Sequence, residues 1–108
     1  MPEHILALTT CPQEKSTGLA KKLVEARVCA CVNIVQEVRS FYWWKGKIED
    51  EAESILLIKT EKKSEDQLWE AIKANHPYEV PEFVVVSVDG GSSDYLEWIS
   101  TSVRQGKT

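Results

Sequence analysis

Residues 30–60 read ACVNIVQEVRSFYWWKGKIEDEAESILLIKT, and this stretch decides which fold the chain can adopt. Valine, isoleucine and aromatic residues are concentrated in residues 30–44, and apolar residues return over residues 48–60 after an acidic patch. Lys45-Gly46-Lys47 separates the two arms with residues typical of a tight turn. The pattern therefore predicts one long β-hairpin. Arms of about a dozen residues exceed the usual strand length of about 5 to 6, so part of the hairpin should project beyond the sheet.

An aromatic run, Phe41-Tyr42-Trp43-Trp44, lies in the first arm of this hairpin. Neighbouring residues of a strand point to opposite faces, so a single layer of helices cannot cover all four rings. Because an uncovered strand is also a template for another chain, we expect a closed symmetric oligomer to cover the projecting hairpin. The alternative is a membrane surface or an aromatic-ligand surface, which the mixed charges nearby disfavour.

Shorter periodic segments flank the hairpin on both sides. In chain order they predict a strand at Ile5–Thr10, a helix at Gln13–Val28, a helix that begins at Ser64 and ends before Pro77, a strand at Phe83–Val88, and a last helix capped by Asp94 with Tyr95, Leu96, Trp98 and Ile99 on its apolar side. Strand, helix, strand, strand, helix, strand is the order of ferredoxin-like domains. We therefore expect an α+β fold, ferredoxin-like β-α-β-β-α-β with a C-terminal helix, as one domain spanning residues 1–108.

The composition excludes several classes of protein. With a net charge of -4 over 108 residues, the chain lacks the basic surface of nucleic-acid binders, so no nucleic-acid partner is expected. Its apolar runs are shorter than the roughly 20 residues of a membrane helix, and the first four residues, MPEH, do not resemble a secretion signal. We therefore expect no membrane insertion and a cytoplasmic location. Cys11, Cys29 and Cys31 are expected to be reduced, the last two in structural roles.

The connection NHPYEVPE, residues 75–82, carries the densest set of chemical groups. Two prolines stiffen it, and in a ferredoxin-like order it enters the strand that pairs with the first strand. His76 should therefore approach Thr9 to Cys11. The Cys11 thiolate and the His76 imidazole form a donor pair that suits copper or zinc. The alternative is that His76 hydrogen-bonds the helix end while Cys11 packs as a small hydrophobe.

Catalytic signatures are missing from the sequence. It has no glycine-rich phosphate loop, no His-Glu-x-x-His pattern and no nucleophile elbow. Asp50, Glu51 and Glu53 are close in sequence, but a charge run beside a hairpin is more often solvated. We therefore expect a protein that is not an enzyme and that requires no cofactor for folding.

Several segments together resemble one known family. They are Ala30-Cys31-Val32-Asn33-Ile34, Trp44-Lys45-Gly46-Lys47, Leu57-Ile58-Lys59-Thr60, His76-Pro77-Tyr78-Glu79-Val80-Pro81-Glu82 and Tyr95-Leu96-x-Trp98. In this order they are similar to the CutA family of divalent-cation tolerance proteins. The resemblance implies a ferredoxin-like subunit in a tight homotrimer, with long hairpins that extend sheets across subunit boundaries. It also implies a role in divalent metal (copper) tolerance or response, with binding of copper or another divalent cation.

The resemblance further implies a set of copper ligands. Some members carry a cysteine at the end of the first strand and two consecutive histidines before Pro-Tyr. Here Thr9 occupies the cysteine position, and Cys11 follows two residues later. Asn75 replaces the first histidine, whereas His76 keeps the second. These four residues are the candidate metal site.

A cleft between subunits is another implication of the resemblance. Polar residues that recur in the family are matched here by Tyr42, Glu53, Lys59, His76, Tyr78 and Glu82. They could gather at subunit junctions, as effector pockets do in the similarly built PII signalling proteins. The alternative function is thus a trimeric PII-like sensor or scaffold that binds a small molecule or a protein partner at intersubunit clefts. Glu79 is a further cleft candidate and, like Glu82, an oxygen donor for harder cations. Hydrogen bonding within an interface is the other explanation for these polar residues.

Overall fold

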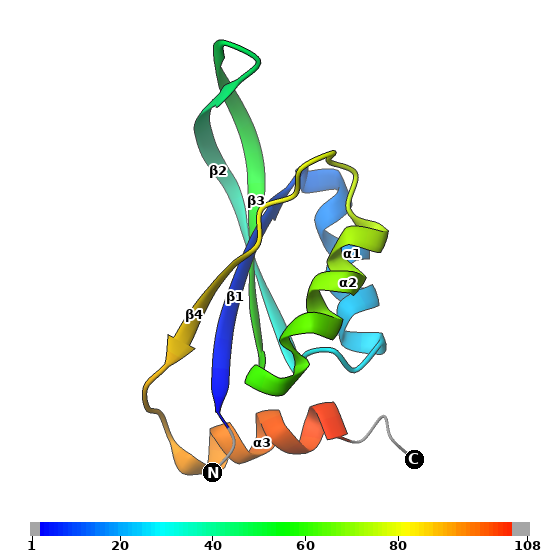
Figure 1. Ribbon diagram of the computed structural model, residues 1–108, viewed down its shortest axis with the longest axis vertical. Helices are drawn as coiled ribbons and strands as arrows, with labels where there is room; N and C mark the ends of the chain where they lie inside the picture. The colour runs from blue at the N-terminus through cyan, green and yellow to red at the C-terminus, as the bar shows by residue number, and fades with distance from the viewer. Residues whose placement is uncertain (1–2, 105–108) are drawn as a thin grey trace.

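Four strands and three α-helices make up a computed structural model that describes residues 3–104 (Figure 1). In chain order the elements are β1 (His4–Cys11), α1 (Gln13–Glu25), β2 (Cys31–Trp44), β3 (Lys47–Glu61), the 3-10 turn η1 (Lys62–Ser64), α2 (Glu65–Asn75), β4 (Val84–Val88) and α3 (Ser93–Arg104). The strands pair antiparallel in the order β2-β3-β1-β4. This is the predicted ferredoxin-like arrangement with a C-terminal helix, so the predicted fold class is confirmed. Residues 1–2 and 105–108 of the predicted domain lie outside the described residues.

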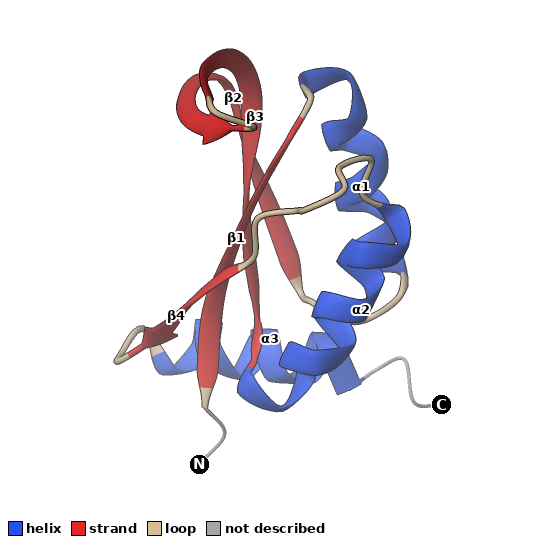
Figure 2. Cartoon of the chain, turned by 45° about the horizontal axis from the view of Figure 1, so that its top comes forward, coloured by secondary structure: helices blue, strands red, loops and turns tan. Residues whose placement is uncertain are grey.

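Helices α1 and α2 lie together on one face of the sheet (Figure 2). The side chains that point to this face form the core, because alternate residues of each strand face the helices. The fully or nearly fully buried members are Ala7, Cys11, Leu19, Ala20, Leu23, Val28, Cys29, Leu56, Ile58, Leu68 and Ile72. On the opposite face, Val84 and Val86 of β4 are about half exposed. Among residues 3–104, α3 is the helix that contacts this open face, at the end where β1 begins (Figure 1).

The hairpin of β2 and β3 extends well beyond the rest of the sheet (Figure 1). The two strands pair from Cys31 opposite Lys59 to Trp44 opposite Lys47. Strand β1 pairs with β3 only between residues 54 and 61, so residues 47–53 have β2 as their strand partner. The molecule is consequently 45 Å long and only 21 Å thick. The predicted projection of the hairpin is confirmed.

Three residues with positive φ shape the hairpin. At its tip, Lys45 and Gly46 have φ values of 53° and 81°, as a two-residue hairpin turn of type I′ requires. Midway along β2, a bulge lies between Val35 and Val38, and Glu37 within it has φ 61°. The Glu37 backbone N–H donates to the side-chain oxygen of Gln13. The bulge is thereby tied to the start of α1.

Helix α1 is shorter than the sequence pattern predicts. Its predicted end, Val28, is wrong, because the helix ends at Glu25 and Arg27 takes a left-handed conformation with φ 61°. The Arg27 N–H bonds the carbonyl of Val24 at 3.0 Å, which satisfies one of the last helical carbonyls. The Arg27 guanidinium donates to the carbonyl of Ser102 at 2.9 Å, near the negative end of α3.

Helix α3 crosses the end of the sheet at which β1 begins (Figure 1). His4 Nε2 lies 2.9 Å from Ser100 Oγ, in a buried contact that joins β1 to α3. The helix is capped by Ser92 and not by Asp94 as predicted, since Ser92 Oγ accepts from the Tyr95 N–H at 3.1 Å. Of the residues on its predicted apolar side, Ile99 is buried, whereas Tyr95 and Trp98 are 41% and 46% exposed. Among residues 3–104, none of the helices has the length and apolar character needed to cross a membrane.

Candidate functional site

His76 lies at the end of β1, where the sequence places it. Helix α2 ends at Asn75, and His76 is extended (φ -92°, ψ 138°), as the residue before a proline must be. Its Nε2 lies 2.8 Å from the backbone oxygen of Thr10. Its Nδ1 accepts a hydrogen bond of 3.1 Å from the Tyr78 N–H. Both ring nitrogens are therefore engaged by the backbone.

Tyr78 reaches from the same loop to the hairpin. Its hydroxyl donates to Glu53 Oε2 at 2.5 Å, a short hydrogen bond of the kind a carboxylate forms. Glu53 is only 3% exposed, although the preceding acidic residues Asp50 and Glu51 are exposed. Burial, followed by the hydrogen bond to Glu53, raises the pKa of Tyr78 above its ordinary value. The phenol therefore stays protonated and acts as a donor at neutral pH.

Two more side-chain hydrogen bonds lie at this end of the sheet, and the first of them completes a cluster. Thr10 Oγ1 donates to Glu82 Oε1 at 3.4 Å, a long hydrogen bond that joins the far end of the loop to β1. Thr10, Glu53, His76, Tyr78 and Glu82 are called the β1-end cluster below. Tyr42 lies nearby on the hairpin and donates to Glu51 Oε1 at 2.8 Å. That hydrogen bond is the main reason that the pKa of Tyr42 rises to about 12.

Thr9 and Cys11 share a face of β1, as predicted, but it is the face that the helices cover. Both side chains are completely buried. Burial, with smaller contributions from Glu53 and Glu14, raises the pKa of Cys11 to about 11, so the thiol is protonated at neutral pH. The Thr9 hydroxyl has no hydrogen-bond partner within the described residues. Cys11 thus packs as a small apolar residue of the core.

The remaining candidates are spread over the surface. Asn75 donates to the Ala71 carbonyl at 2.8 Å and accepts from Lys22 Nζ at 3.4 Å, which fastens the end of α2. Exposed Glu79 contributes to a shallow pocket whose other lining residues are Trp69, Lys73, Tyr78, Val80 and Pro81.

Lys59 lies on the open face near α3. Its Nζ is 3.3 Å from the Tyr95 hydroxyl and 5.5 Å from the centre of the Tyr95 ring. Lys59 follows Glu53 by six positions along β3, which at about 3.3 Å per residue is about 20 Å. One copy of the chain therefore does not bring all the cleft candidates together.

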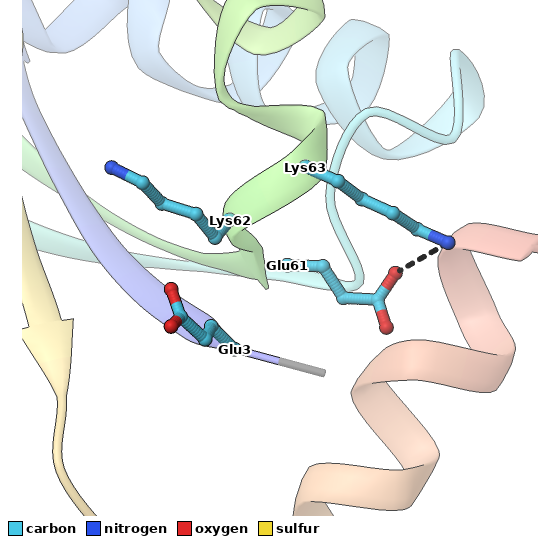
Figure 3. Close-up of a pocket in the computed structure, with 4 residues that line it drawn as sticks. All are labelled: Glu3, Glu61, Lys62 and Lys63. Atoms are coloured by element: carbon cyan, nitrogen blue, oxygen red, sulfur yellow. Dashed lines mark ion pairs between the residues drawn. The ribbon is translucent and has the colours of Figure 1, made fainter. Parts of the chain in front are cut away.

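A second pocket lies at the opposite end of the sheet from the β1-end cluster. Figure 3 shows Glu3 and Lys62 on one side of it and Glu61 and Lys63 on the other. Lys63 Nζ is 3.6 Å from a carboxylate oxygen of buried Glu61. Two acidic and two basic side chains balance one another there, so this pocket favours neither an anion nor a cation.

Sequence reasoning missed two members of this region. Thr10 was not singled out because strand alternation directs attention to Thr9 and Cys11, yet it is Thr10 that contacts the loop through its carbonyl and its hydroxyl. Glu51 was assigned to a solvated charge run, but it accepts from Tyr42. The spacing of Tyr42 and Glu51 across a hairpin turn at Lys45-Gly46 is the signal that could have revealed the pair. Within residues 3–104, no three His, Cys, Asp or Glu side chains are grouped as a metal site.

The fold and the β1-end cluster define a ferredoxin-like α+β protein with a projecting hairpin and a polar loop at the end of β1. The model of the CutA1 divalent ion tolerance protein family matches residues 5–102. The chain therefore belongs to the CutA1 divalent ion tolerance family.

Individual relatives agree with this assignment. Protein CutA 1 of Oryza sativa, described as chloroplastic, is 40% identical over 105 residues, which are 97% of this chain and 59% of that protein. The chain thus spans well under two thirds of the rice protein. The divalent-cation tolerance protein CutA of Pectobacterium atrosepticum is 40% identical over 94% of both chains. A cytoplasmic location stays a prediction.

Solved structures give the same result. CutA1 from Oryza sativa superposes with a TM-score of 0.90 at 42% identity and covers 93% of each chain. The PII-like protein CutA from Nostoc superposes with a TM-score of 0.86 at 37% identity and covers 95% of this chain and 97% of the other. The fold is therefore shared with proteins described both as divalent-cation tolerance proteins and as PII-like proteins.

Proposed function

We propose that this chain forms a homotrimer that takes part in the response to divalent cations as a non-enzymatic, PII-like sensor. Ligands would bind at the junctions between copies, beside the β1-end cluster. The observation that carries the proposal is the open face of the sheet, on which α3 covers the end where β1 begins while Val35, Val84 and Val86 stay partly exposed. The family description, divalent ion tolerance, and the PII-like description of the Nostoc relative support the two parts of the proposed role.

The open face has the chemistry of an interface between copies. Val35, Val84 and Val86 are each 41% to 50% exposed on this face. Burying this surface would stabilise the protein by about 25 cal/mol for each Å² of apolar area removed from water. The hairpin adds exposed aromatic rings, with Trp43 72% exposed. A closed ring of copies would cover both the face and the hairpin without leaving an unpaired edge.

Assembly would also complete the cleft. Lys59 and Glu53 are about 20 Å apart within one copy at about 3.3 Å per residue of strand. If both serve one cleft, Lys59 must come from a neighbouring copy. Such a cleft would combine one ammonium group with the carboxylates of Glu53 and Glu82 and with two phenols, Tyr42 and Tyr78. That combination of donors and acceptors suits a small polar molecule with both acidic and basic groups.

Direct copper binding by the metal-site candidates fits the geometry poorly. Cys11 is completely buried with its pKa raised to about 11, whereas a copper ligand must be a thiolate. His76 uses both ring nitrogens in hydrogen bonds to the backbone. Asn75 is committed to Ala71 and Lys22. We therefore propose that the ligand binds at the junction cleft and that Cys11, His76 and Asn75 do not bind copper.

A thermal-shift panel tests the proposed ligand class. The reduced protein is scanned with copper, zinc, cobalt, nucleotides and small amino and carboxylic acids, because a ligand of the native state raises Tm. We expect a shift with a small acid or nucleotide that is lost in both Lys59→Met and Tyr78→Phe. A matched control is Lys63→Met, which removes an equal charge at the opposite end of the sheet. A panel in which only copper shifts Tm, equally in all variants, contradicts the proposed cleft.

A further inference from the structure

The hydrogen bonds of His76 specify which nitrogen carries its proton. A backbone carbonyl can only accept, so Nε2, 2.8 Å from the Thr10 oxygen, must bear hydrogen. A backbone N–H can only donate, so Nδ1, 3.1 Å from the Tyr78 nitrogen, must present its lone pair. The imidazole is therefore in the neutral Nε2–H form with both nitrogens used. A proton or a metal at Nδ1 would have to displace the Tyr78 N–H.

Proline explains why the ring and the backbone meet in this way. Pro77 has no N–H, so the first backbone donor after His76 is that of Tyr78. Pro77 also holds His76 in an extended conformation, which turns the chain out of α2. The ring then lies between β1 and the returning loop. It bridges the Thr10 carbonyl, which accepts from Nε2–H, and the Tyr78 amide N–H, which donates to Nδ1.

The bridge fixes where Tyr78 points. The two ring centres of His76 and Tyr78 are 4.9 Å apart, with a tilt of 52° between the planes. Tyr78 is half-buried, and its hydroxyl lies 2.5 Å from Glu53 Oε2. Glu82 is held on the other side of the loop by the Thr10 hydroxyl. The two ends of the loop thus share one anchor residue in β1.

We propose that His76 is a positioning residue and not a metal ligand in the folded protein. As the neutral Nε2–H tautomer it holds the 76–82 loop against β1. It thereby orients the Tyr78 hydroxyl toward Glu53. The inference concerns the loop itself, so it does not depend on the proposed ligand. If no ligand shifts Tm in the thermal-shift panel, the proposed role of His76 is unaffected. If the His76 hydrogen bonds are absent, the proposed trimer is unaffected.

The tautomer is measurable in the wild-type protein. Long-range proton-nitrogen correlation spectra of the full chain at neutral pH should show one His76 nitrogen of the protonated type and one bare nitrogen, with the proton on Nε2. The Nδ1–H form, or rapid exchange between the two forms, would overturn the proposal. This measurement needs no variant, so it remains decisive if a substitution prevents folding.

The positioning role is tested by the ionisation of Tyr78. Ultraviolet difference titration of the three tyrosines, with Tyr78→Phe to identify its signal, follows the phenol. In His76→Ala and His76→Gln we expect Tyr78 to ionise at lower pH than in the wild type, because the hydroxyl no longer reaches buried Glu53. Asn75→Ala is the matched control, since it removes the neighbouring side chain and should leave the titration unchanged. An unshifted Tyr78 in both His76 variants would overturn the proposal.

Copper titration of the same four proteins tests the second half of the statement. We expect the wild type, His76→Ala, His76→Gln and Asn75→Ala to bind copper equally, at whatever level the wild type shows. Copper binding at one ion per chain that is lost in both His76 variants and retained in Asn75→Ala would contradict the assignment.

Discussion

The two faces of the sheet differ sharply although their residues are of the same kind. On the helix-covered face, Leu56 and Ile58 of β3 are completely buried. On the open face, the residue between them, Leu57, is only partly buried, and Val86 of β4 is 47% exposed. Antiparallel sheets commonly have one apolar face and one polar face. Exposed apolar residues on the second face therefore favour burial of that face against another surface. The comparison teaches that one face is buried within the chain, whereas we propose that neighbouring copies bury the other.

Adjacent leucines of β3 provide the largest test of this comparison. Leu56→Ala should destabilise the fold by about 3 kcal/mol at any protein concentration, because it leaves a cavity in a closed core. Leu57→Ala should instead have an effect that depends on protein concentration, since its contacts on the open face would come from other copies. Urea unfolding at several concentrations separates the two. Equal, concentration-independent losses would break the distinction between the faces.

The two buried cysteines allow the covered face to be tested through the pH dependence of stability. Burial raises the pKa of Cys11 to about 11 and, as the largest cause, that of Cys29 to about 12. Between the ordinary thiol pKa of 9.0 and these raised values, the unfolded chain has lost the thiol proton and the folded chain still holds it. Stability should therefore fall as pH rises above 9, by up to about 1.4 kcal/mol per pH unit for each thiol.

Denaturant unfolding between pH 8 and 10 measures this slope. Cys11→Ala and Cys29→Ala should each flatten it. Cys31→Ser, on the open face and only partly buried, is the control and should leave it unchanged. An identical slope in all three variants would show that the covered face does not hold these thiols in their protonated form.

Substitutions at the hairpin tip, which lies outside both faces of the sheet, should change stability by a smaller amount. Gly46 has φ 81°, so Gly46→Ala should destabilise the fold by about 1 kcal/mol through left-handed backbone strain. Its neighbour Lys45 has φ 53°, and Lys45→Asn should be mildly stabilising because asparagine tolerates this conformation. Thermal unfolding compares the two variants with the wild type. A Gly46→Ala protein as stable as the wild type would contradict the type I′ turn.

Hydrophobic periodicity was sufficient to predict the fold but not the ends of its elements. The alternation in residues 30–60 indicates a hairpin wherever the chain folds, because it reflects which side chains avoid water. The end of α1 depends on Arg27 entering a left-handed conformation, which no apolar pattern records. Trp98 looks like a core residue, yet it is exposed because α3 borders the open face. Periodicity reports that a residue is apolar and does not report what covers it.

The candidate site was predicted in part for a similar reason. Pro77 and the strand order bring His76 to the end of β1, so the meeting of loop and strand follows from the sequence. The burial of Glu53 does not, since it depends on Tyr78 folding over an acidic segment of the hairpin. Which ring nitrogen of His76 carries the proton depends on the positions of Thr10 O and Tyr78 N, and only the folded backbone defines these.

The mass of the protein in solution tests most directly whether other copies complete the open face. Sedimentation equilibrium at micromolar concentration should give three times the chain mass of 12.2 kDa for the wild type. Val86→Glu places a charge on the open face at the edge strand β4 and should shift the mass to that of one chain, while the exposed Glu79→Ala should not. A wild-type mass of 12.2 kDa would contradict the account.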